Sequence, residues 1–199
     1  MDYKIPILFL VIVLFSCSRE PLPILGEIPS FELIDNYGEP FTEENIEGKI
    51  WVADLIFTTC AGPCPIMSTE MRSVHKTYLE NENIRMVTIT VNPDYDTPEV
   101  LTEYGKQYNA DFTKWHFLTG VYEKIQNLIA NGFKMGDLEE IVFHSTRFAL
   151  IDLDMYCAKA TLAKEMNGVM PEYSDTIEIK QGSNPILYIQ GKSIIPLDL

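Results

Sequence analysis

The sequence predicts an α/β protein built on one mixed sheet, and two observations lead to this fold class. Between residues 50 and 152, strand-like apolar runs alternate with segments of helical periodicity. Ahead of them, FELIDNYGEPFT alternates apolar and polar residues around Tyr37-Gly38, which is typical of a β-hairpin. The expected order is therefore a hairpin followed by strand–helix–strand–helix–strand–helix–strand. The chain of 199 residues has the usual length of one domain.

The first three elements after the hairpin follow from side-chain type and spacing. Residues 50–59 (IWVADLIFTT) are rich in β-branched and aromatic side chains, as in a buried central strand. A helix is expected from Cys64 through Leu79, because its apolar residues recur three or four positions apart. Residues 84–91 (IRMVTITV) predict the next strand.

The next three elements begin with a capping signal. Asp96-Thr97-Pro98-Glu99 supplies an N-cap candidate and a proline near the first turn of a helix that runs to about Tyr108. Trp115 to Leu118 predicts a short strand. Val121 to Asn131 predicts a helix that ends at Gly132, since glycine is the common residue after a helix C-terminus.

The last strand of this order is expected over Arg147 to Asp152 (RFALID). Beyond Asp154 the pattern is weaker. MYCAKATLAKEMNG is compatible with a helix that ends at Gly168, and SNPILYIQGKSIIPL with a late strand or hairpin.

The charge of the chain excludes one class of function. Asp and Glu number 29 against 15 Lys and Arg, a formal net charge of −14. A broad nucleic-acid-binding face is not expected, because neutralising phosphates requires Lys and Arg. Four cysteines are also too few for a small disulfide-stapled fold.

The N-terminus predicts export and a lipid anchor. Residues 5–16 form an uninterrupted apolar run behind Lys4, too short to cross a bilayer but of the length of a signal-peptide core. Leu14-Phe15-Ser16-Cys17 resembles the lipobox of bacterial lipoproteins, which are cleaved before the cysteine and acylated on it. We therefore expect a signal peptide over 1–16, lipidation of Cys17 and a tether over 17–30. The alternative is an uncleaved anchor; in both cases the protein faces the extracytoplasmic side of a membrane in the bacterial cell envelope.

A pair of cysteines marks the candidate site. Cys60 and Cys64 follow the predicted central strand, one in the loop and one entering the helix. The end of a strand that leads into a helix is the usual place for a site in α/β sheets, and a helix N-terminus favours thiolate over thiol. Two thiolates suit Cu(I), and an added imidazole would let the same site hold Cu(II). A structural disulfide or two buried thiols remain the alternatives.

The sequence contains three histidines that could supply a third copper ligand. His75 lies within the predicted first helix, at the surface or the edge of the core, and His116 lies in the short strand, so packing explains both. His144 lies in a loop just before the last strand. Taken alone, a loop histidine is more often structural than a metal ligand.

Four segments carry the most distinctive residues: Phe57–Met67 (FTTCAGPCPIM), Val91–Glu99 (VNPDYDTPE), Phe117–Gly120 (FLTG), and His144-Ser145 before a strand that ends in Leu150-Ile151-Asp152. In this order they resemble the signatures of the Sco/SenC family over about residues 28–154. The resemblance implies a thioredoxin-like fold, with an N-terminal β-hairpin and a mixed central sheet flanked by helices. It places that domain at residues 31–154 and leaves 155–199 as a divergent segment that completes the same domain.

The resemblance also implies a function. Members of the family bind one copper ion, Cu(I) or Cu(II), through two cysteines and a histidine, here Cys60, Cys64 and His144. They assist assembly of the copper A centre of cytochrome c oxidase, as copper chaperones or as thiol reductants. The implied partners are the copper-bearing oxidase subunit or another cuproenzyme, other periplasmic copper carriers and thiol reductants.

The chain departs from the family at three places. Phe143 stands where the family usually has Asp before the ligand histidine, and Asn92 replaces the Asp of an Asp-Pro pair. An acidic neighbour could orient the imidazole or adjust metal release. Cys157 lies in the divergent segment, as an inert buried thiol, a resolving cysteine or an extra ligand.

The leading hypothesis is a membrane-tethered copper chaperone. The second is a periplasmic thiol-disulfide oxidoreductase in which Cys60 attacks and Cys64 resolves, and a Cys60–Cys64 disulfide would block copper binding. The third is a lipoprotein whose cysteines form only a structural disulfide. A thiol peroxidase is disfavoured, because Phe57 stands where such enzymes have Thr. Zinc is disfavoured because a structural zinc site needs four protein ligands.

Overall fold

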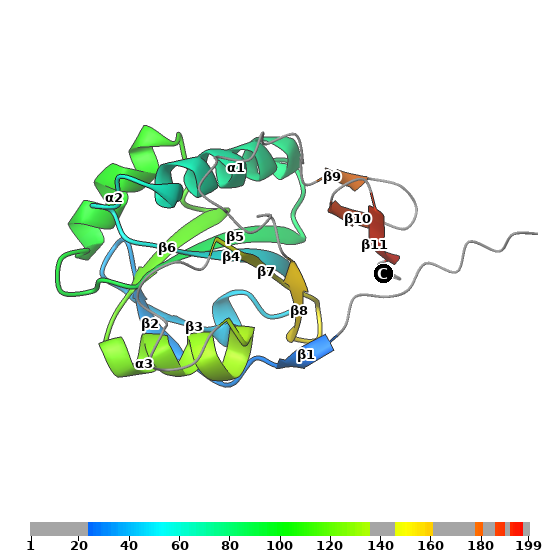
Figure 1. The fold of residues 1–199 in the computed structure, drawn as a ribbon, viewed down its shortest axis with the longest axis horizontal. Coiled ribbons are helices and arrows are strands. Elements are labelled where there is room, and N and C mark those ends of the chain that lie inside the picture. The colour runs from blue at the N-terminus through cyan, green and yellow to red at the C-terminus, as the bar shows by residue number, and fades with distance from the viewer. Residues whose placement is uncertain (1–23, 136–145, 161–177, 181–185, 190–191, 197–199) are drawn as a thin grey trace, which may run out of the picture.

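The computed structural model describes residues 24–135, 146–160, 178–180, 186–189 and 192–196. An eight-stranded mixed sheet lies at its centre, with the strands in the order β1-β8-β7-β4-β5-β6-β2-β3 (Figure 1). The strands are β1 (Ile24–Glu27), β2 (Glu32–Asp35), β3 (Pro40–Thr42), β4 (Ile50–Ile56), β5 (Ile84–Thr90), β6 (Trp115–Thr119), β7 (Phe148–Ile151) and β8 (Tyr156–Ala160). The helices are α1 (Pro63–Tyr78), α2 (Pro98–Gln107) and α3 (Tyr122–Asn127), which continues as the π-helix η2 (Leu128–Phe133), and a 3₁₀ turn η1 covers Glu43–Asn45.

This architecture confirms the predicted fold class. The hairpin is the antiparallel β2–β3 pair, which turns at Tyr37-Gly38 as expected. β4, β5 and β6 run parallel, whereas β7 lies antiparallel to β4. The strand and helix order predicted from residue 50 to residue 152 is therefore the observed one, with β4 in the middle of the sheet.

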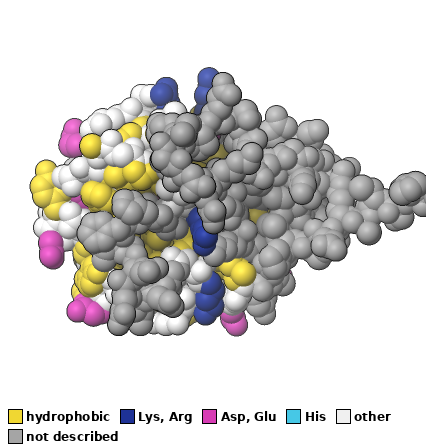
Figure 2. All heavy atoms as spheres, in the orientation of Figure 1, with side chains coloured by type: hydrophobic (Ala, Val, Ile, Leu, Met, Phe, Trp, Pro, Cys, Tyr) yellow, Lys and Arg dark blue, Asp and Glu magenta, His cyan; other side chains and the backbone are white. Residues whose placement is uncertain are grey.

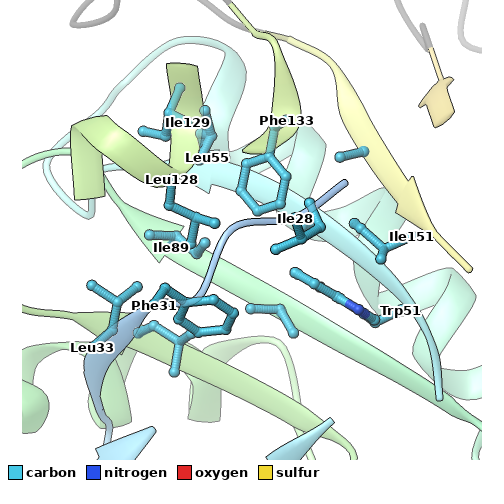
Figure 3. Close-up of a cluster of buried hydrophobic side chains, with 14 of the residues drawn as sticks. Ile28, Phe31, Leu33, Trp51, Leu55, Ile89, Leu128, Ile129, Phe133 and Ile151 are labelled. Atoms are coloured by element: carbon cyan, nitrogen blue, oxygen red, sulfur yellow. The ribbon is translucent and has the colours of Figure 1, made fainter. Parts of the chain in front are cut away.

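The two faces of the sheet carry separate hydrophobic clusters. Val52 and Ile56 of β4 point to the face covered by α1 and α2, where they pack with Met71. Trp51 points to the opposite face, covered by α3 and η2, where it meets Phe133 (Figures 1 and 3). Alternate side chains of a strand face opposite sides, so β4 is buried on both. This burial explains why its sequence is almost continuously apolar.

The predicted end of the third helix is wrong. The helix does not stop at Gly132 but continues as a π-helix through Phe133 and ends at Lys134, which has a left-handed φ of 53°. A Cβ at Gly132 would lie 3.0 Å from Leu128 Cδ1 and 3.1 Å from Pro29 Cδ. Glycine is thus needed here for close packing and not for termination.

The helix expected after Asp154 is contradicted over its described part. Residues 156–160 form β8, which pairs antiparallel with β7 and with β1. A tight turn reverses the chain, since the Met155 N–H donates to the Asp152 carbonyl at 3.2 Å and Met155 has a positive φ of 62°. The strand β1 was also not predicted, because it lies within the segment expected to be a tether.

The late hairpin is confirmed. β10 (Ile186–Ile189) and β11 (Lys192–Pro196) pair antiparallel, and β9 (Glu178–Lys180) adds a third strand to this small second sheet. None of the helices in the described ranges is long and apolar enough to span a bilayer. The predicted signal peptide and Cys17 lie outside the described residues.

The excess of negative charge does not collect on the face shown in Figure 2. Over the described part of that face, Asp and Glu side chains lie mostly along its left edge, whereas Lys and Arg side chains lie nearer its middle. The described part of this face therefore carries both signs of charge and not a single acidic patch.

Candidate metal centre

The thiol pair lies where the central strand meets its helix. β4 ends at Ile56 and not at residue 59 as predicted, because the chain turns there: the Cys60 N–H donates to the Phe57 carbonyl at 3.1 Å. Gly62 is the N-cap of α1, and Pro63 occupies the first position of the helix. Backbone N–H groups at this position have no partner within the helix, so the missing N–H of proline costs no hydrogen bond. Cys60 therefore lies in the loop and Cys64 in the first turn of α1, as the sequence predicted.

The structure brings the two sulfurs together as thiols. The Cys60 and Cys64 side chains are close enough for each to change the pKa of the other, and no disulfide joins the cysteines in the described part of the chain. Cys60 is partly exposed, whereas Cys64 is only 5% exposed and packs against the cluster beneath α1. One sulfur is thus accessible to a reaction partner and the other is shielded.

The two thiols ionise differently. Partial burial opposes ionisation of Cys60, but hydrogen bonds from the Cys64 thiol and from the backbone N–H groups of Cys64 and Gly62 outweigh it and lower the pKa of Cys60. Burial, followed by the hydrogen bond with Cys60, raises the pKa of Cys64 to about 12. Cys60 is therefore the thiol that ionises first.

This difference predicts selective alkylation. In the reduced, metal-free protein at pH 7.5, iodoacetamide should modify Cys60 roughly tenfold or more faster than Cys64, because the thiolate is the nucleophile. Peptide mass spectrometry over a time course measures both rates. The same reaction in denaturant is the control, where the two rates should converge. Equal rates in the folded protein would contradict the assignment.

The remaining histidines do not approach the thiol pair. His75 is buried within α1; its Nε2 accepts the Asp111 N–H at 3.0 Å, and burial lowers its pKa. His116 packs against the Phe41 ring at a centroid distance of 4.9 Å, and burial lowers its pKa to about 4. These contacts fit the packing roles expected from the sequence, although His75 is a core residue and not a surface one.

His144 and Phe143 lie outside the described residues. In the part of the chain that the structure describes, no three His, Cys, Asp or Glu side chains are grouped so as to hold a metal ion. The structure therefore describes two of the three predicted ligands.

Cys157 lies on the other side of the sheet. It is fully buried in the cluster that contains Trp51 and Phe133, and its Sγ lies 3.8 Å from the Phe133 carbonyl oxygen. Cys64 belongs to the cluster on the opposite face. Of the roles left open for Cys157, this position favours the buried thiol over a resolving cysteine or an extra ligand.

Sequence reasoning missed two buried carboxylates near the site. The N-cap candidate expected within residues 96–99 is Thr97, which accepts the Val100 N–H, whereas Asp96 is buried. Both carboxylate oxygens of Asp96 accept hydrogen bonds from Thr58, two residues before Cys60. The local sequence around Asp96 gives no sign that its carboxylate binds Thr58 and does not cap α2.

The second is Asp54, fully buried on β4. Its Oδ1 accepts a hydrogen bond from Thr88 Oγ1 at 2.6 Å, while its Oδ2 has no partner among the described residues. Burial raises the pKa of Asp54 to about 7, against the opposing hydrogen bond from Thr88. A carboxylate inside an apolar strand run was the signal that could have marked it.

A thiol pair at a strand–helix junction, on a mixed sheet with helices on both faces, defines a thioredoxin-like protein. The chain belongs to the SCO1/SenC family, whose sequence model matches residues 25–170. A relative with broad coverage is the SCO1 protein homolog of Bacillus subtilis, 29% identical over 180 residues, which are 85% of this chain and 91% of that protein.

Solved structures agree with this assignment. The SCO1/SenC family lipoprotein of Bacillus anthracis is 31% identical with a TM-score of 0.61, over 71% of this chain and 86% of that one. BsSco, described as a member of the Sco family of cytochrome c oxidase assembly proteins with a disulfide switch, is 29% identical with a TM-score of 0.60, over 70% and 86%. Copper-bound ScoI of Arabidopsis thaliana is 28% identical with a TM-score of 0.55, over 67% and 86%.

Proposed function

We propose that this protein is a membrane-tethered copper chaperone that holds one copper ion through Cys60, Cys64 and His144 and assists assembly of the copper A centre of cytochrome c oxidase. The observation that carries the proposal is the pair of neighbouring thiols, one partly exposed and more readily ionised, the other buried. Two soft sulfur ligands at one point fit Cu(I). The copper-bound relative and the oxidase-assembly relative support this choice of cargo and partner.

Each thiol has its own part in loading and release. Cys60 offers a thiolate at the protein surface, so it is the first sulfur to meet an incoming copper ion. Cys64 loses its proton on binding and holds the ion from the buried side. Because Cys60 is accessible, a ligand of the partner can replace its sulfur while Cys64 still holds the ion. Transfer then proceeds by ligand exchange, and both cysteines must be reduced beforehand.

A periplasmic thiol-disulfide oxidoreductase is the second candidate, and the same asymmetry favours it. The Cys60 thiolate would attack a partner disulfide and form a mixed disulfide with release of one partner thiolate. Cys64, after losing its proton, would attack the Cys60 sulfur, which yields a Cys60–Cys64 disulfide and the second partner thiolate. The partner gains two electrons, and this protein loses two.

The proposed location is the bacterial cell envelope, with Cys17 lipidated and the domain on the extracytoplasmic side. The Bacillus anthracis relative is described as a lipoprotein, which supports a lipid anchor here. Metabolic labelling with a fatty-acid analogue should mark the wild-type chain and not a Cys17→Ser variant.

An anaerobic copper titration tests the chaperone proposal. The full chain, in detergent and with Cys17→Ser, should bind one copper per molecule, with sulfur-to-Cu(II) charge-transfer absorption in the oxidised form. Cys60→Ser, Cys64→Ser and His144→Ala should each lose tight binding, because each removes a ligand. Cys157→Ser is the matched cysteine control and should bind like the parent. A parent protein without copper but with a reversible Cys60–Cys64 disulfide would instead favour the oxidoreductase.

A further inference from the structure

The carboxylate of Asp96 contacts the loop between β4 and α1, residues 57–62, which carries Cys60 and is called the thiol loop below. Asp96 itself comes from a distant part of the chain. Asp96 lies just before α2 and is fully buried. Its Oδ2 accepts the Thr58 backbone N–H at 3.1 Å, and its Oδ1 accepts the Thr58 hydroxyl. Thr58 is thus held through both its backbone and its side chain by one carboxylate. A two-point contact of this kind restricts orientation as well as position.

Thr58 belongs to the turn that sets Cys60 in place. That turn begins at Phe57 and closes where the Cys60 N–H donates to the Phe57 carbonyl. A shift of Thr58 would change the start of the turn and move the Cys60 sulfur relative to Cys64. Because Cys64 is fixed in α1, the spacing of the two sulfurs depends on this loop.

Asp96 is itself held rigidly. Its Oδ2 also accepts the Thr90 hydroxyl at the end of β5, and Thr90 Oγ1 in turn accepts the Asn92 N–H at 2.9 Å. The Asp96 N–H donates to the Asn92 carbonyl at 3.0 Å. The ends of β4 and β5 are joined beside it, since the Val91 N–H donates to the Ile56 carbonyl at 2.8 Å. The carboxylate is therefore a fixed point against which the thiol loop is aligned.

We propose that Asp96 is a positioning residue that holds Cys60 at the spacing from Cys64 that copper binding requires, by fixing Thr58 through two hydrogen bonds to its carboxylate. This inference rests on the proposed copper site. Groups that orient metal ligands without touching the metal affect binding because a misplaced ligand cannot complete the coordination geometry.

A Thr58→Val variant tests the link. It keeps the backbone bond and the shape of the side chain but removes the hydroxyl bond to Asp96. In the full chain with Cys17→Ser, in detergent, we expect Cu(I) affinity to fall by about tenfold or more. We also expect a changed Cys60 alkylation rate in the metal-free protein and a shifted charge-transfer band with Cu(II). Thr58→Ser restores the hydroxyl and should recover all three readouts.

Thr102→Val is the matched control. It removes a hydroxyl hydrogen bond of α2, to the Asn36 carbonyl at 2.7 Å, that involves neither Asp96 nor the thiol loop. It should lower thermal stability about as much as Thr58→Val while leaving Cu(I) affinity and Cys60 reactivity close to the parent values. Asp96→Asn is a further variant and should resemble Thr58→Val.

The outcomes are distinguishable. If Thr58→Val and Thr102→Val change stability alike and neither changes copper affinity or Cys60 reactivity, the positioning role is overturned. A failure of Thr58→Ser to restore the readouts would overturn it as well. If the parent chain binds no copper, the proposed function fails, and the Cys60 alkylation rates of the same variants still decide the positioning role.

Discussion

Replacing Asp54 by Asn should remove a loss of stability that the wild-type protein suffers as the pH rises toward neutrality. Burial raises the pKa of Asp54 from its ordinary value of 3.8 to about 7 in the folded state. Between these two values the folded protein holds a proton that the unfolded chain has released. The contribution of Asp54 to the free energy of unfolding is therefore fully present below the pKa that Asp54 has in the unfolded chain. It is lost as the pH rises through the pKa that Asp54 has in the folded protein.

The expected size follows from the shift. Each pKa unit corresponds to about 1.4 kcal/mol, so between pH 5 and pH 8 the wild type should lose roughly 2 to 3 kcal/mol relative to Asp54→Asn. Asn keeps an oxygen that can accept the Thr88 hydroxyl and carries no charge into the core.

Urea unfolding of both proteins at several pH values measures this difference. Asp94→Asn, at an exposed position, is the control and should give a profile parallel to that of the wild type. A constant difference between Asp54→Asn and wild type across this range would contradict a raised pKa for Asp54. Chemical shifts of the Asp54 carboxyl carbon would give its titration directly.

The second large effect is expected from Phe133→Ala. Phe133 is fully buried in η2, and its ring meets Trp51 edge to face at a centroid distance of 5.8 Å (Figure 3). Truncation removes the buried ring and leaves a cavity between η2 and the sheet, with an expected loss of about 3 to 5 kcal/mol in the free energy of unfolding. The backbone carbonyl near Cys157 Sγ is retained in the variant.

Denaturant unfolding measures this loss, with Tyr122→Ala as a control at the other end of the same helical segment. Tyr122 is 39% exposed, so its truncation should change stability by only about 0.5 kcal/mol. Similar losses for both variants would mean that η2 does not pack on the sheet as described. Copper binding should survive in either variant under native conditions, because both residues lie on the face opposite Cys64.

Periodicity was enough to predict the centre of the fold. β4, α1, β5 and α2 lie close to their expected bounds, because each has a strong apolar pattern and a clear start or stop signal. The thiol pair was also placed correctly, since a strand end followed by a helix start can be recognised from the sequence. These features depend on neighbours close in the chain.

The features that sequence reasoning missed depend on distant parts of the chain. β8 follows a turn and becomes a strand by pairing with β7 and β1, which its own helix-compatible sequence does not indicate. Gly132 resembles a helix stop, but its role comes from the close approach of Pro29. Asp96 lies in the segment predicted to start α2, but its partner Thr58 is 38 residues away. Local patterns carry no information about such pairings.

The position of Cys157 also bears on how the protein would respond to oxidation. The three thiols of the described residues can in principle pair in three ways, and wrong pairings normally need an isomerase to correct them. Here a hydrogen-bonded β-sheet stands between Cys157 and the other two sulfurs. Once the sheet has formed, oxidation of these three thiols has a single intramolecular product, the Cys60–Cys64 disulfide, and a reductant acting at the surface restores both thiols. The fold itself thereby protects against scrambled oxidation products.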